Sequence, residues 1–438
     1  MKIQLIRPPF DSWCNNKGQM TELEAPPIGL AIIAKCVRDA DVEIIDGLNL
    51  PLDEIVKQIN GNIIGVSDIY SNHLNSLKIL KEAKNKGAVT FIGGTNVTYL
   101  AENILKNHSY VDYAVIGDGE NSLSKFISGE DIKEIPNLIY RKDSAIIRNR
   151  TENAPLTTLF DLEKVANLHL NPSSALLISS IRGCIKAEKG GRCSFCSIRH
   201  PLRVMQPELV WEQIRTLNEK YGSEFFYETG DSFMVRDFPE KLLSARPKKL
   251  RQIQIKFYAS PDQINNENIK ILKELNARDI FLGVESVNDS ILGDSGKSYR
   301  MTDIENAIFL LDEHHISPVQ VTFIYGLPGE TKESAEETLN FAKRIAEKHP
   351  NLKIFSSLPI PFPGTQLFNN IKNHPEARKE YDGDLDKDDF FDYKKLIQIQ
   401  TKYFTSVEYD ILCEYARKTW QLAGEGKRSS YYINETIS

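Results

Sequence analysis

Three cysteines lie close together near the middle of the chain, at Cys184, Cys193 and Cys196. Thiolates are the usual ligands of iron–sulfur clusters, and three of them on a four-iron cluster leave one iron open to another ligand. Gly183 precedes them and suits a backbone that wraps closely around a cofactor. A second interpretation is equally concrete, because the same cysteines and His200 would make a closed Cys₃His zinc site. The spacing therefore predicts a metal centre of one of these two kinds.

The part of the chain that holds the cysteines alternates β-rich runs with amphipathic helical runs. Strands are expected at 175–178, 224–227, 254–258, 279–284, 319–325 and 353–358, with helices at 207–221, 266–276, 302–314 and 332–347. Six such units over residues 173–370 predict a partial TIM-type (β/α)6 barrel, whose chemistry belongs at the carboxyl ends of its strands. The cysteines follow the first strand, so we expect them on that face. A helical C-terminal extension is expected at 371–438.

The first third of the chain also alternates strands and helices. Strands are expected at 2–7, 42–46, 63–67, 89–93 and 113–117, helices at 29–40, 52–60 and 75–86, and a hairpin at 136–150. This α/β pattern predicts a doubly wound, Rossmann-like parallel sheet over residues 1–150, which would bind a ligand at the carboxyl ends of its strands. Residues 151–172 are expected to be a linker.

The composition is that of a globular protein. The chain has 438 residues and a formal net charge of -6, with lysine and arginine spread along its length. This balance disfavours a nucleic-acid partner, because phosphate recognition usually shows as a basic excess. There is no signal-peptide pattern and no apolar run near the ~18 residues that a membrane span needs. Six cysteines in a chain of this length do not make a disulfide scaffold. We therefore expect a cytoplasmic protein without a membrane partner.

The cysteine loop resembles that of radical S-adenosylmethionine (SAM) proteins, and the chain from about residue 2 to residue 370 is similar to members that carry an N-terminal cobalamin-binding domain. The usual family spacing is C-x3-C-x2-C with an aromatic residue before the last cysteine, a position that Phe195 occupies here. The eight-residue gap between Cys184 and Cys193 departs from that spacing. The resemblance implies that Cys184, Cys193 and Cys196 ligate a [4Fe-4S] cluster and that SAM chelates the fourth iron.

The family's SAM-binding elements have counterparts after the later strands. By resemblance, the turn after the second strand holds the SAM amino group, the turn after the fourth strand lies near the ribose, and the turn after the fifth packs against the adenine. The corresponding residues are Thr229, Gly230 and Asp231; Glu285 and Ser286; and Gly326 and Leu327. A fourth match, Pro361–Thr365, follows the sixth strand. Glycine and proline are also common in ordinary βα turns, so the interpretation depends on finding all four in order.

Cobalamin domains of the methionine-synthase kind carry DxHxxG, SxL and GG elements, and the first of these is absent here. Ser67 and the pair Gly93–Gly94 are counterparts of the other two, and Gly117 fits the family's end of this domain. The resemblance implies a cobalamin whose lower base is buried without ligating cobalt. The alternative is a degenerate domain that binds none. We interpret His73 as a surface residue or cap neighbour without a role.

Three hypotheses about function follow. The first is a cobalamin-dependent radical SAM methyltransferase that acts on an unactivated carbon. The second is a radical SAM enzyme without cobalamin that performs rearrangement, cyclisation or epimerisation, and the third is a zinc-stabilised binding protein. An enzyme of either kind would need a flavodoxin- or ferredoxin-type electron donor and a small-molecule or peptide substrate. Methylthiotransferases carry a second cysteine triad in their N-terminal domain, whereas that part of this chain has only Cys14 and Cys36, so this activity is disfavoured. The aspartates within 384–389 are interpreted as a solvated acidic run and not as a metal site.

Overall fold

The computed structural model describes residues 1–11, 25–170, 174–198, 200–381, 383, 385 and 392–422. Cys14 and the four aspartates of the acidic run lie outside these ranges. The described residues divide into two compact units, the first formed mainly by residues up to 170 and the second mainly by residues from 174 onward. Within the described ranges, no helix combines the length and the apolar character needed to cross a bilayer.

Unit 1 is built on a seven-stranded sheet with the order β2-β1-β3-β4-β5-β6-β7. The first five strands in this order are parallel, and β6 and β7 form the antiparallel hairpin at one edge. The strands are β1 (Lys2–Arg7), β2 (Asp41–Asp46), β3 (Ile63–Ser67), β4 (Val89–Gly93), β5 (Tyr113–Val115), β6 (Leu138–Lys142) and β7 (Ala145–Arg148). The central strands β1, β3 and β4 are buried almost throughout, which is typical of a parallel sheet covered on both faces.

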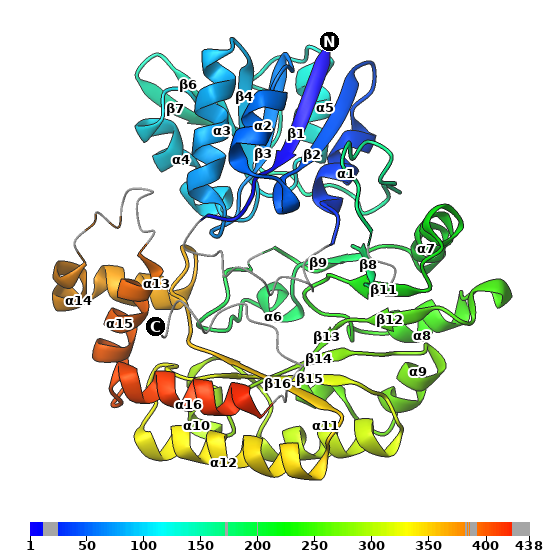
Figure 1. Cartoon of the computed structure of the whole chain (residues 1–438), viewed down its shortest axis with the longest axis vertical. Coiled ribbons are helices and arrows are strands. Elements are labelled where there is room, and N and C mark those ends of the chain that lie inside the picture. The colour runs from blue at the N-terminus through cyan, green and yellow to red at the C-terminus, as the bar shows by residue number, and fades with distance from the viewer. Residues whose placement is uncertain are drawn as a thin grey trace. The chain divides into compact units, whose positions relative to one another are not determined.

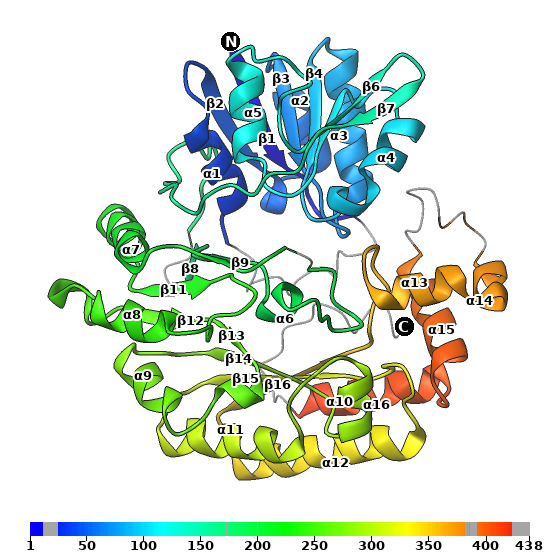
Figure 2. The same ribbon diagram turned by 180° about the vertical axis from the view of Figure 1, so that it is seen from behind.

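The helices of unit 1 cover both faces of that sheet (Figure 1 and Figure 2). Helix α1 packs with α5, and α2 packs with α3, which is the doubly wound arrangement that the alternation predicts. The helices are α1 (Ile28–Cys36), α2 (Leu52–Gln58), α3 (His73–Asn85), α4 (Val97–Asn107) and α5 (Glu120–Ile127), and a short 3-10 helix, η2, covers Gly47–Asn49. The strand order reverses between β1 and β3, so the loops after these two strands flank the switch point at which such sheets bind ligands.

Unit 2 contains the predicted six-stranded parallel half-barrel. Its strands follow each other in chain order, β8, β11, β12/β13, β14, β15 and β16, and each pairs in parallel with the next. They cover β8 (Leu176–Ile178), β11 (Phe225–Glu228), β12 (Gln254–Lys256), β13 (Tyr258–Ala259), β14 (Ile280–Glu285), β15 (Val319–Ile324) and β16 (Leu352–Ser357). The third predicted strand is interrupted at Phe257, which is fully buried, and this break separates the sheet into parts of three and four strands.

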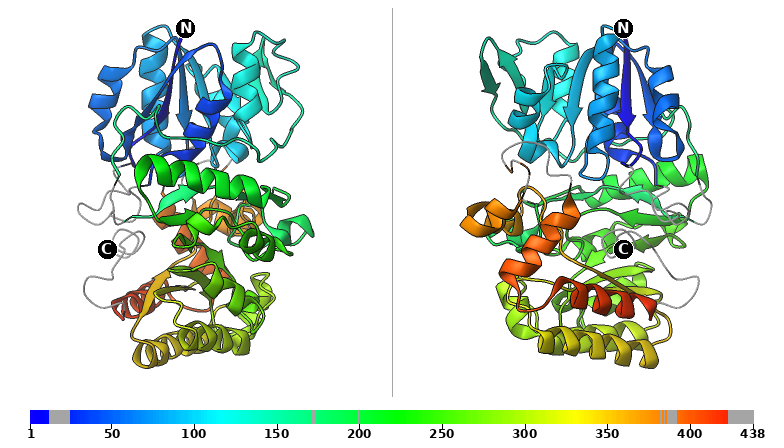
Figure 3. Two further views of the ribbon diagram at one scale, coloured as in Figure 1. Left: turned by 90° about the vertical axis from the view of Figure 1, so that its right-hand side faces the viewer. Right: turned by 60° about the vertical axis from the view of Figure 1, so that its left-hand side comes forward.

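Helices cover the outer side of these strands and continue beyond them. They are α7 (Pro207–Tyr221), α8 (Phe238–Ser244), α9 (Asn268–Glu274), α10 (Asp289–Asp294), α11 (Met301–Glu313), α12 (Lys332–Lys348), α13 (Gln366–Asn373), α14 (Pro375–Glu380), α15 (Tyr393–Phe404) and α16 (Tyr409–Gln421), with 3-10 helices η3 (Lys248–Leu250) and η4 (Pro261–Gln263). Helix α16, in red, lies beside α12, in yellow (Figure 3), and also contacts β16. The predicted helical C-terminal segment is therefore present, and α16 extends the outer helical layer past the sixth strand.

Candidate functional site

The cysteine loop begins and ends on a short antiparallel ribbon that the sequence did not predict. Strand β9 (Ile181–Arg182) follows β8 and pairs with β10 (Arg203–Val204), so the loop between them is closed at its base. Gly183 leaves this ribbon with a φ of +85°, and a Cβ added there would lie 2.4 Å from the carbonyl oxygen of Pro201. Only glycine fits this position without moving backbone. The ribbon and Gly183 together fix the point at which Cys184 leaves the barrel.

The three cysteines lie on this loop as half-buried free thiols. Cys184 immediately precedes the short helix α6 (Ile185–Glu188), and the Ser232 hydroxyl lies 3.7 Å from its sulfur. The Cys196 amide donates to the Cys193 carbonyl oxygen at 3.1 Å, and the Ile198 amide lies 3.4 Å from the Cys196 sulfur. Burial is the largest influence on the pKa of Cys193 and Cys196 and raises both, and Cys184 adds a smaller upward contribution to each.

The electrostatics of the loop bear on whether the thiols suit a metal cluster. Burial raises the pKa of Cys193 and raises that of Cys196 to about 11, whereas the charges of Lys297 and Lys186 act on Cys193 in the opposite direction. Metal ligation requires the thiolate, so these buried sulfurs need positive charge beside them, which the iron ions of a cluster would supply. The donor set, the shared loop and the nearby lysines fit a [4Fe-4S] cluster.

The zinc alternative needs His200 and the three cysteines to meet at one point. Among the described residues, no group of three or more His, Cys, Asp or Glu side chains is arranged to hold a single metal ion. In a four-iron cluster each cysteine binds its own iron, so its thiolates need not converge on one point.

The turn after β11 carries the predicted residues Thr229, Gly230 and Asp231, and it packs on the base of the cysteine loop. The Gly183 amide donates to Asp231 Oδ2 at 3.0 Å, and the Thr229 hydroxyl donates to the Ile178 carbonyl oxygen at 3.1 Å. A Cβ at Gly230 would lie 2.6 Å from that of Ile181 in the ribbon. Burial is the largest influence on the Asp231 carboxyl and raises its pKa. The structure thus brings these three residues to the cysteine loop.

Glu228, the last residue of β11, is a buried carboxylate that the sequence analysis did not single out. It accepts hydrogen bonds from the Ser180 amide at 3.0 Å and the Gly230 amide at 2.8 Å, and also from the Ser180 hydroxyl. Burial raises its pKa to about 7 even though these donors act against the shift. This side chain joins the turns after β8 and β11. Its full burial marks it as important, and burial can be seen only in the tertiary structure.

The turn after β14 brings Glu285 and Phe195 to the same lysine. Glu285 has a φ of +61°, and the pairing of β14 with β15 shifts register between Gly283 and Glu285. Lys297 donates to Glu285 Oε1 at 2.8 Å, and its ammonium lies 5.3 Å from the centre of the Phe195 ring. Ser286 is fully buried and takes part in the following turn. Sequence reasoning identified Glu285 and Phe195 but missed Lys297.

The turn after β15 contains Gly326 and Leu327, and both are buried. Gly326 has a φ of +99°, and its amide donates to the carboxylate of Glu330. Burial raises the pKa of Glu330 to about 7. The Gly329 amide donates to the Phe404 carbonyl oxygen at 2.8 Å, so the end of α15 packs on this turn. The two predicted residues lie at the carboxyl end of β15, and Glu330 is a second buried carboxylate that organises a turn there.

The cysteine loop also contacts the segment between α10 and α11 and the first turn of α13. The Ser194 amide donates to the Ser295 carbonyl oxygen at 3.0 Å, and the Ser194 carbonyl oxygen accepts from the Leu367 amide at 3.1 Å. Leu367 is in the first turn of α13, which Thr365 caps by accepting from the Phe368 amide. The carboxyl ends of β11, β14 and β16 are thus all connected to the loop, as expected for a site on this face of the barrel.

In unit 1 the predicted residues Ser67, Gly93, Gly94 and Gly117 lie at the carboxyl ends of β3, β4 and β5. Gly94 has a φ of +121°, and a Cβ there would lie 2.2 Å from the Asp68 carbonyl oxygen. Gly93 accepts from the Asp68 amide at 2.6 Å, so the turns after β3 and β4 are in close contact. Gly94 is therefore required by the Asp68 backbone, and the two turns lie at the carboxyl edge of the sheet, where doubly wound domains bind their ligands.

The structure corrects the interpretation of His73 as a surface residue. His73 is the first residue of α3 and is 1% exposed, and its Nδ1 lies 2.7 Å from Asp68 Oδ2. Asn96 donates to the other Asp68 carboxylate oxygen at 2.8 Å. Asp11, after β1, caps the same helix by accepting from the amides of Leu74 and Asn75, while burial raises its pKa. A buried polar network therefore joins the segments that follow β1, β3 and β4 at the carboxyl edge of the sheet.

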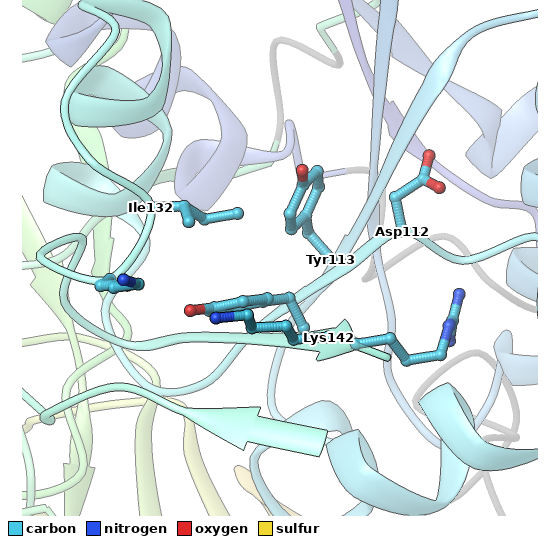
Figure 4. Close-up of a pocket in the computed structure, with 7 residues that line it drawn as sticks. Asp112, Tyr113, Ile132 and Lys142 are labelled. Carbon is cyan, nitrogen blue, oxygen red and sulfur yellow. The ribbon is translucent and has the colours of Figure 1, made fainter. Parts of the chain in front are cut away.

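A separate pocket lies at the β5–β6 side of unit 1 (Figure 4). None of the predicted site residues lines it. The lining residues are Asp112, Tyr113, Ile132, Lys133, Tyr140, Arg141 and Lys142. Asp112 precedes β5 and Tyr113 begins it, so the pocket adjoins the amino end of that strand, opposite to Gly117.

Comparison with known proteins agrees with this two-part organisation. The family model of the radical SAM superfamily matches residues 178–342, and that of the B12 binding domain matches residues 20–127. The chain is 28% identical over 389 residues to an uncharacterized methyltransferase of Pyrococcus horikoshii, covering 84% of this chain and 82% of that protein. It is 24% identical over 414 residues to an anaerobic magnesium-protoporphyrin IX monomethyl ester cyclase of Cereibacter sphaeroides, covering 86% of this chain but 64% of the cyclase.

Among solved structures, the radical SAM methyltransferase TsrM of Kitasatospora setae superposes with a TM-score of 0.66 at 16% identity, covering 84% of this chain and 75% of TsrM. This likeness supports the fold. The two family models confirm the predicted domain order and are consistent with the expected [4Fe-4S] cluster, SAM and cobalamin. The chain therefore combines an N-terminal B12-binding domain with a radical SAM domain, and it is an enzyme of the radical SAM superfamily.

Proposed function

We propose that the protein is a cobalamin-dependent radical SAM methyltransferase that methylates an unactivated carbon of a small molecule or peptide. One observation carries this proposal: a loop with three free thiols at the carboxyl face of a six-stranded half-barrel is joined in one chain to a B12-binding domain. When bound, the cluster would supply the electron that cleaves SAM to methionine and a 5′-deoxyadenosyl radical, and cobalamin would carry the methyl group.

The residues of the chain would divide this work by position. Cys184, Cys193 and Cys196 hold the cluster on a loop whose backbone is fixed at both ends. The turns after β11 and β14, with Asp231 and Glu285, lie beside that loop and offer carboxylates to the polar groups of SAM. Each methylated product would need two molecules of SAM and two electrons, so the enzyme would use a one-electron donor of the flavodoxin or ferredoxin type.

The relationship to the cyclase supports a second candidate, a radical SAM enzyme that forms or rearranges bonds without methyl transfer. That relative matches 86% of this chain at an identity close to that of the methyltransferase relative. The two candidates share the cysteine loop and differ in products. Methyl transfer would yield S-adenosylhomocysteine and 5′-deoxyadenosine in equal amounts, whereas the second candidate would yield 5′-deoxyadenosine alone.

The first experiment tests the metal centre. Protein purified and reconstituted without oxygen should bind about four irons with sulfide and form 5′-deoxyadenosine from SAM when given dithionite. Alanine at Cys184, Cys193 or Cys196 should abolish both properties. Alanine at Cys36 is the matched control, because Cys36 is also half-buried but lies on α1 of unit 1. Stoichiometric zinc in place of iron, or 5′-deoxyadenosine from the three variants, would refute the assignment.

The second experiment tests cobalamin. Wild-type protein should bind hydroxocobalamin tightly enough to survive gel filtration, and the bound corrinoid should change its absorption spectrum. Because Gly94 packs on the Asp68 backbone, Gly94→Ala should weaken this binding. A wild-type protein that carries the cluster and cleaves SAM, yet binds no corrinoid, would exclude methyl transfer through cobalamin and favour the second candidate.

A further inference from the structure

The segment between α10 and α11 packs against the cysteine loop. Ser295 accepts from the Ser194 amide, and Lys186 donates to the Gly296 carbonyl oxygen at 2.9 Å. Gly296 has a φ of +80°, and a Cβ there would lie 2.1 Å from the carbonyl oxygen of Arg192. Backbone of the loop therefore contacts backbone of this segment at both Ser295 and Gly296. The next residue, Lys297, has its main chain fixed with respect to the loop.

The side chain of Lys297 is held inside the barrel by three groups. Its ammonium lies 2.8 Å from Glu285 Oε1, 5.3 Å from the ring centre of Phe195 and 5.5 Å from that of Tyr299. Both members of the ion pair are almost buried, with side-chain exposures of 12% for the lysine and 10% for the glutamate. The Tyr299 hydroxyl in turn donates to the Gly283 carbonyl oxygen at 2.7 Å. One carboxylate and two aromatic faces thus confine the ammonium.

The position of the Lys297 ammonium decides which charge of the ion pair acts on the cysteine loop. Phe195 lies between Cys193 and Cys196 in the sequence, so the ammonium is packed against the segment that carries two of the three sulfurs. Burial would lower the pKa of Lys297, but Glu285 and Tyr299 raise it above its ordinary value, so the side chain keeps its charge. The ammonium contacts the loop at the Phe195 ring, 5.3 Å from its centre, while the Glu285 carboxylate binds the ammonium at 2.8 Å. The positive end of the ion pair therefore faces the cysteine loop.

We propose that Lys297 is a positioning residue whose buried ammonium stabilises the reduced state of the iron–sulfur cluster and raises its reduction potential. The inference rests on the proposed function, because it requires that the three cysteines hold a cluster. Reduction adds one electron to that cluster, and a fixed positive charge in a low-dielectric site favours the more negative state. The electron comes from the one-electron donor named above, and no bond to Lys297 forms or breaks.

The test is a redox titration of the reconstituted cluster without SAM, in which electron paramagnetic resonance measures the reduced fraction. Lys297→Met should lower the ratio of reduced to oxidised cluster on the order of tenfold at a given potential, which is about 59 mV for one electron. Lys297→Arg keeps the charge and should keep most of the wild-type potential. Glu285→Gln removes the opposing charge and should shift the potential upward.

Lys256→Met is the matched control. Lys256 pairs with Asp279 at 3.1 Å, and the two side chains are 13% and 11% exposed, so this pair is buried to the same extent as the pair of Lys297. Asp279 precedes β14 whereas Glu285 ends it, and a six-residue strand separates them by about 20 Å. Removing this charge should leave the potential unchanged.

The outcomes separate the inference from the proposed function. A wild-type protein that binds no four-iron cluster would refute the proposed function itself. If wild type, Lys297→Met and Lys256→Met all carry the cluster at one shared potential, the role of Lys297 is refuted while the proposed function stands. If Lys297→Met does not fold, Lys297→Gln and Glu285→Gln decide, because opposite shifts of the potential support the inference and the lack of any shift overturns it.

Discussion

Gly183 offers the sharpest test of how the cysteine loop is built, because another glycine of the loop separates two effects of one substitution. Gly183 has a φ of +85°, and an alanine Cβ would lie 2.4 Å and 2.5 Å from the carbonyl oxygens of Pro201 and His200. Gly190 has a φ of +77° but no atom within 4 Å of its added Cβ. Alanine at Gly190 therefore tests backbone strain alone, and alanine at Gly183 tests strain together with collision.

The structure sets the size of each effect. A left-handed alanine costs about 1–2 kcal/mol, which is the full expected cost at Gly190. At Gly183 the collision must also move the amide that donates to Asp231, and losing a hydrogen bond to a charged group costs about 1.5–3 kcal/mol. The total for Gly183→Ala is then about 2.5–5 kcal/mol. Because Cys184 is the next residue, the displaced backbone should also lose iron.

Two measurements check this prediction. Urea unfolding followed by circular dichroism gives the loss of unfolding free energy for each variant, and iron analysis after reconstitution gives the occupancy of the cluster. Gly190→Ala should keep its iron and lose about 1–2 kcal/mol of unfolding free energy, whereas Gly183→Ala should be depleted of iron and lose about 2.5–5 kcal/mol. Equal stability and equal iron content in the two variants would contradict the role assigned to the close contact at Gly183.

Three further predictions concern buried polar groups and the glycine turn of unit 1. Gly94→Ala should weaken corrinoid binding at least tenfold in an equilibrium titration, because its Cβ would lie 2.2 Å from the Asp68 carbonyl oxygen; unchanged affinity would place the ligand elsewhere. Burial raises the pKa of Glu228 from the ordinary value of 4.5 to about 7 in the folded state. The folded state therefore binds the proton more tightly than the unfolded state, so this carboxyl stabilises the fold at low pH, and the stabilisation is lost as the pH rises from about 4.5 to 7. Glu228→Gln should flatten that part of the stability curve, and an unaltered slope would exclude this carboxyl as the cause. His73→Ala should cost about 3 kcal/mol because it removes the hydrogen bond between His73 and the buried Asp68 carboxylate, whereas His349→Ala, in an exposed pair with Asp312, should cost less than about 1 kcal/mol. Similar losses of stability in the two variants would show that burial adds nothing to the contribution of the His73–Asp68 pair.

Much of the fold could be predicted from local patterns. Period-two and helical hydrophobic patterns, with glycine and proline between them, located all six strands of the half-barrel and the five parallel strands of unit 1. The βα alternation also predicted that these strands are parallel, which the structure confirms, whereas the order of the strands was not predicted. The break of the third barrel strand at Phe257 and the β9–β10 ribbon were not predicted, because both depend on contacts with distant segments.

His73 and Lys297 show why the rest of the site could not be found in the same way. Neither residue lies in a recognisable motif, and an isolated histidine or lysine is usually exposed. Their importance comes from burial and from their partners. His73 pairs with Asp68, which lies on the turn after β3, and Lys297 pairs with Glu285, which lies twelve residues earlier at the end of β14. Only folding brings these groups within hydrogen-bonding distance.

The sequence by itself supplied the candidate ligands of the metal site, because three cysteines, whose thiolates are the usual ligands of iron–sulfur clusters, lie within one short loop after a strand. It also determined the order of the two domains, because repeated βα units specify a parallel sheet. The tertiary structure decided which charges surround the thiols and which turns hold the loop. Burial and electrostatic fields depend on distances between side chains that are far apart in the chain, and these distances exist only after the strands have assembled.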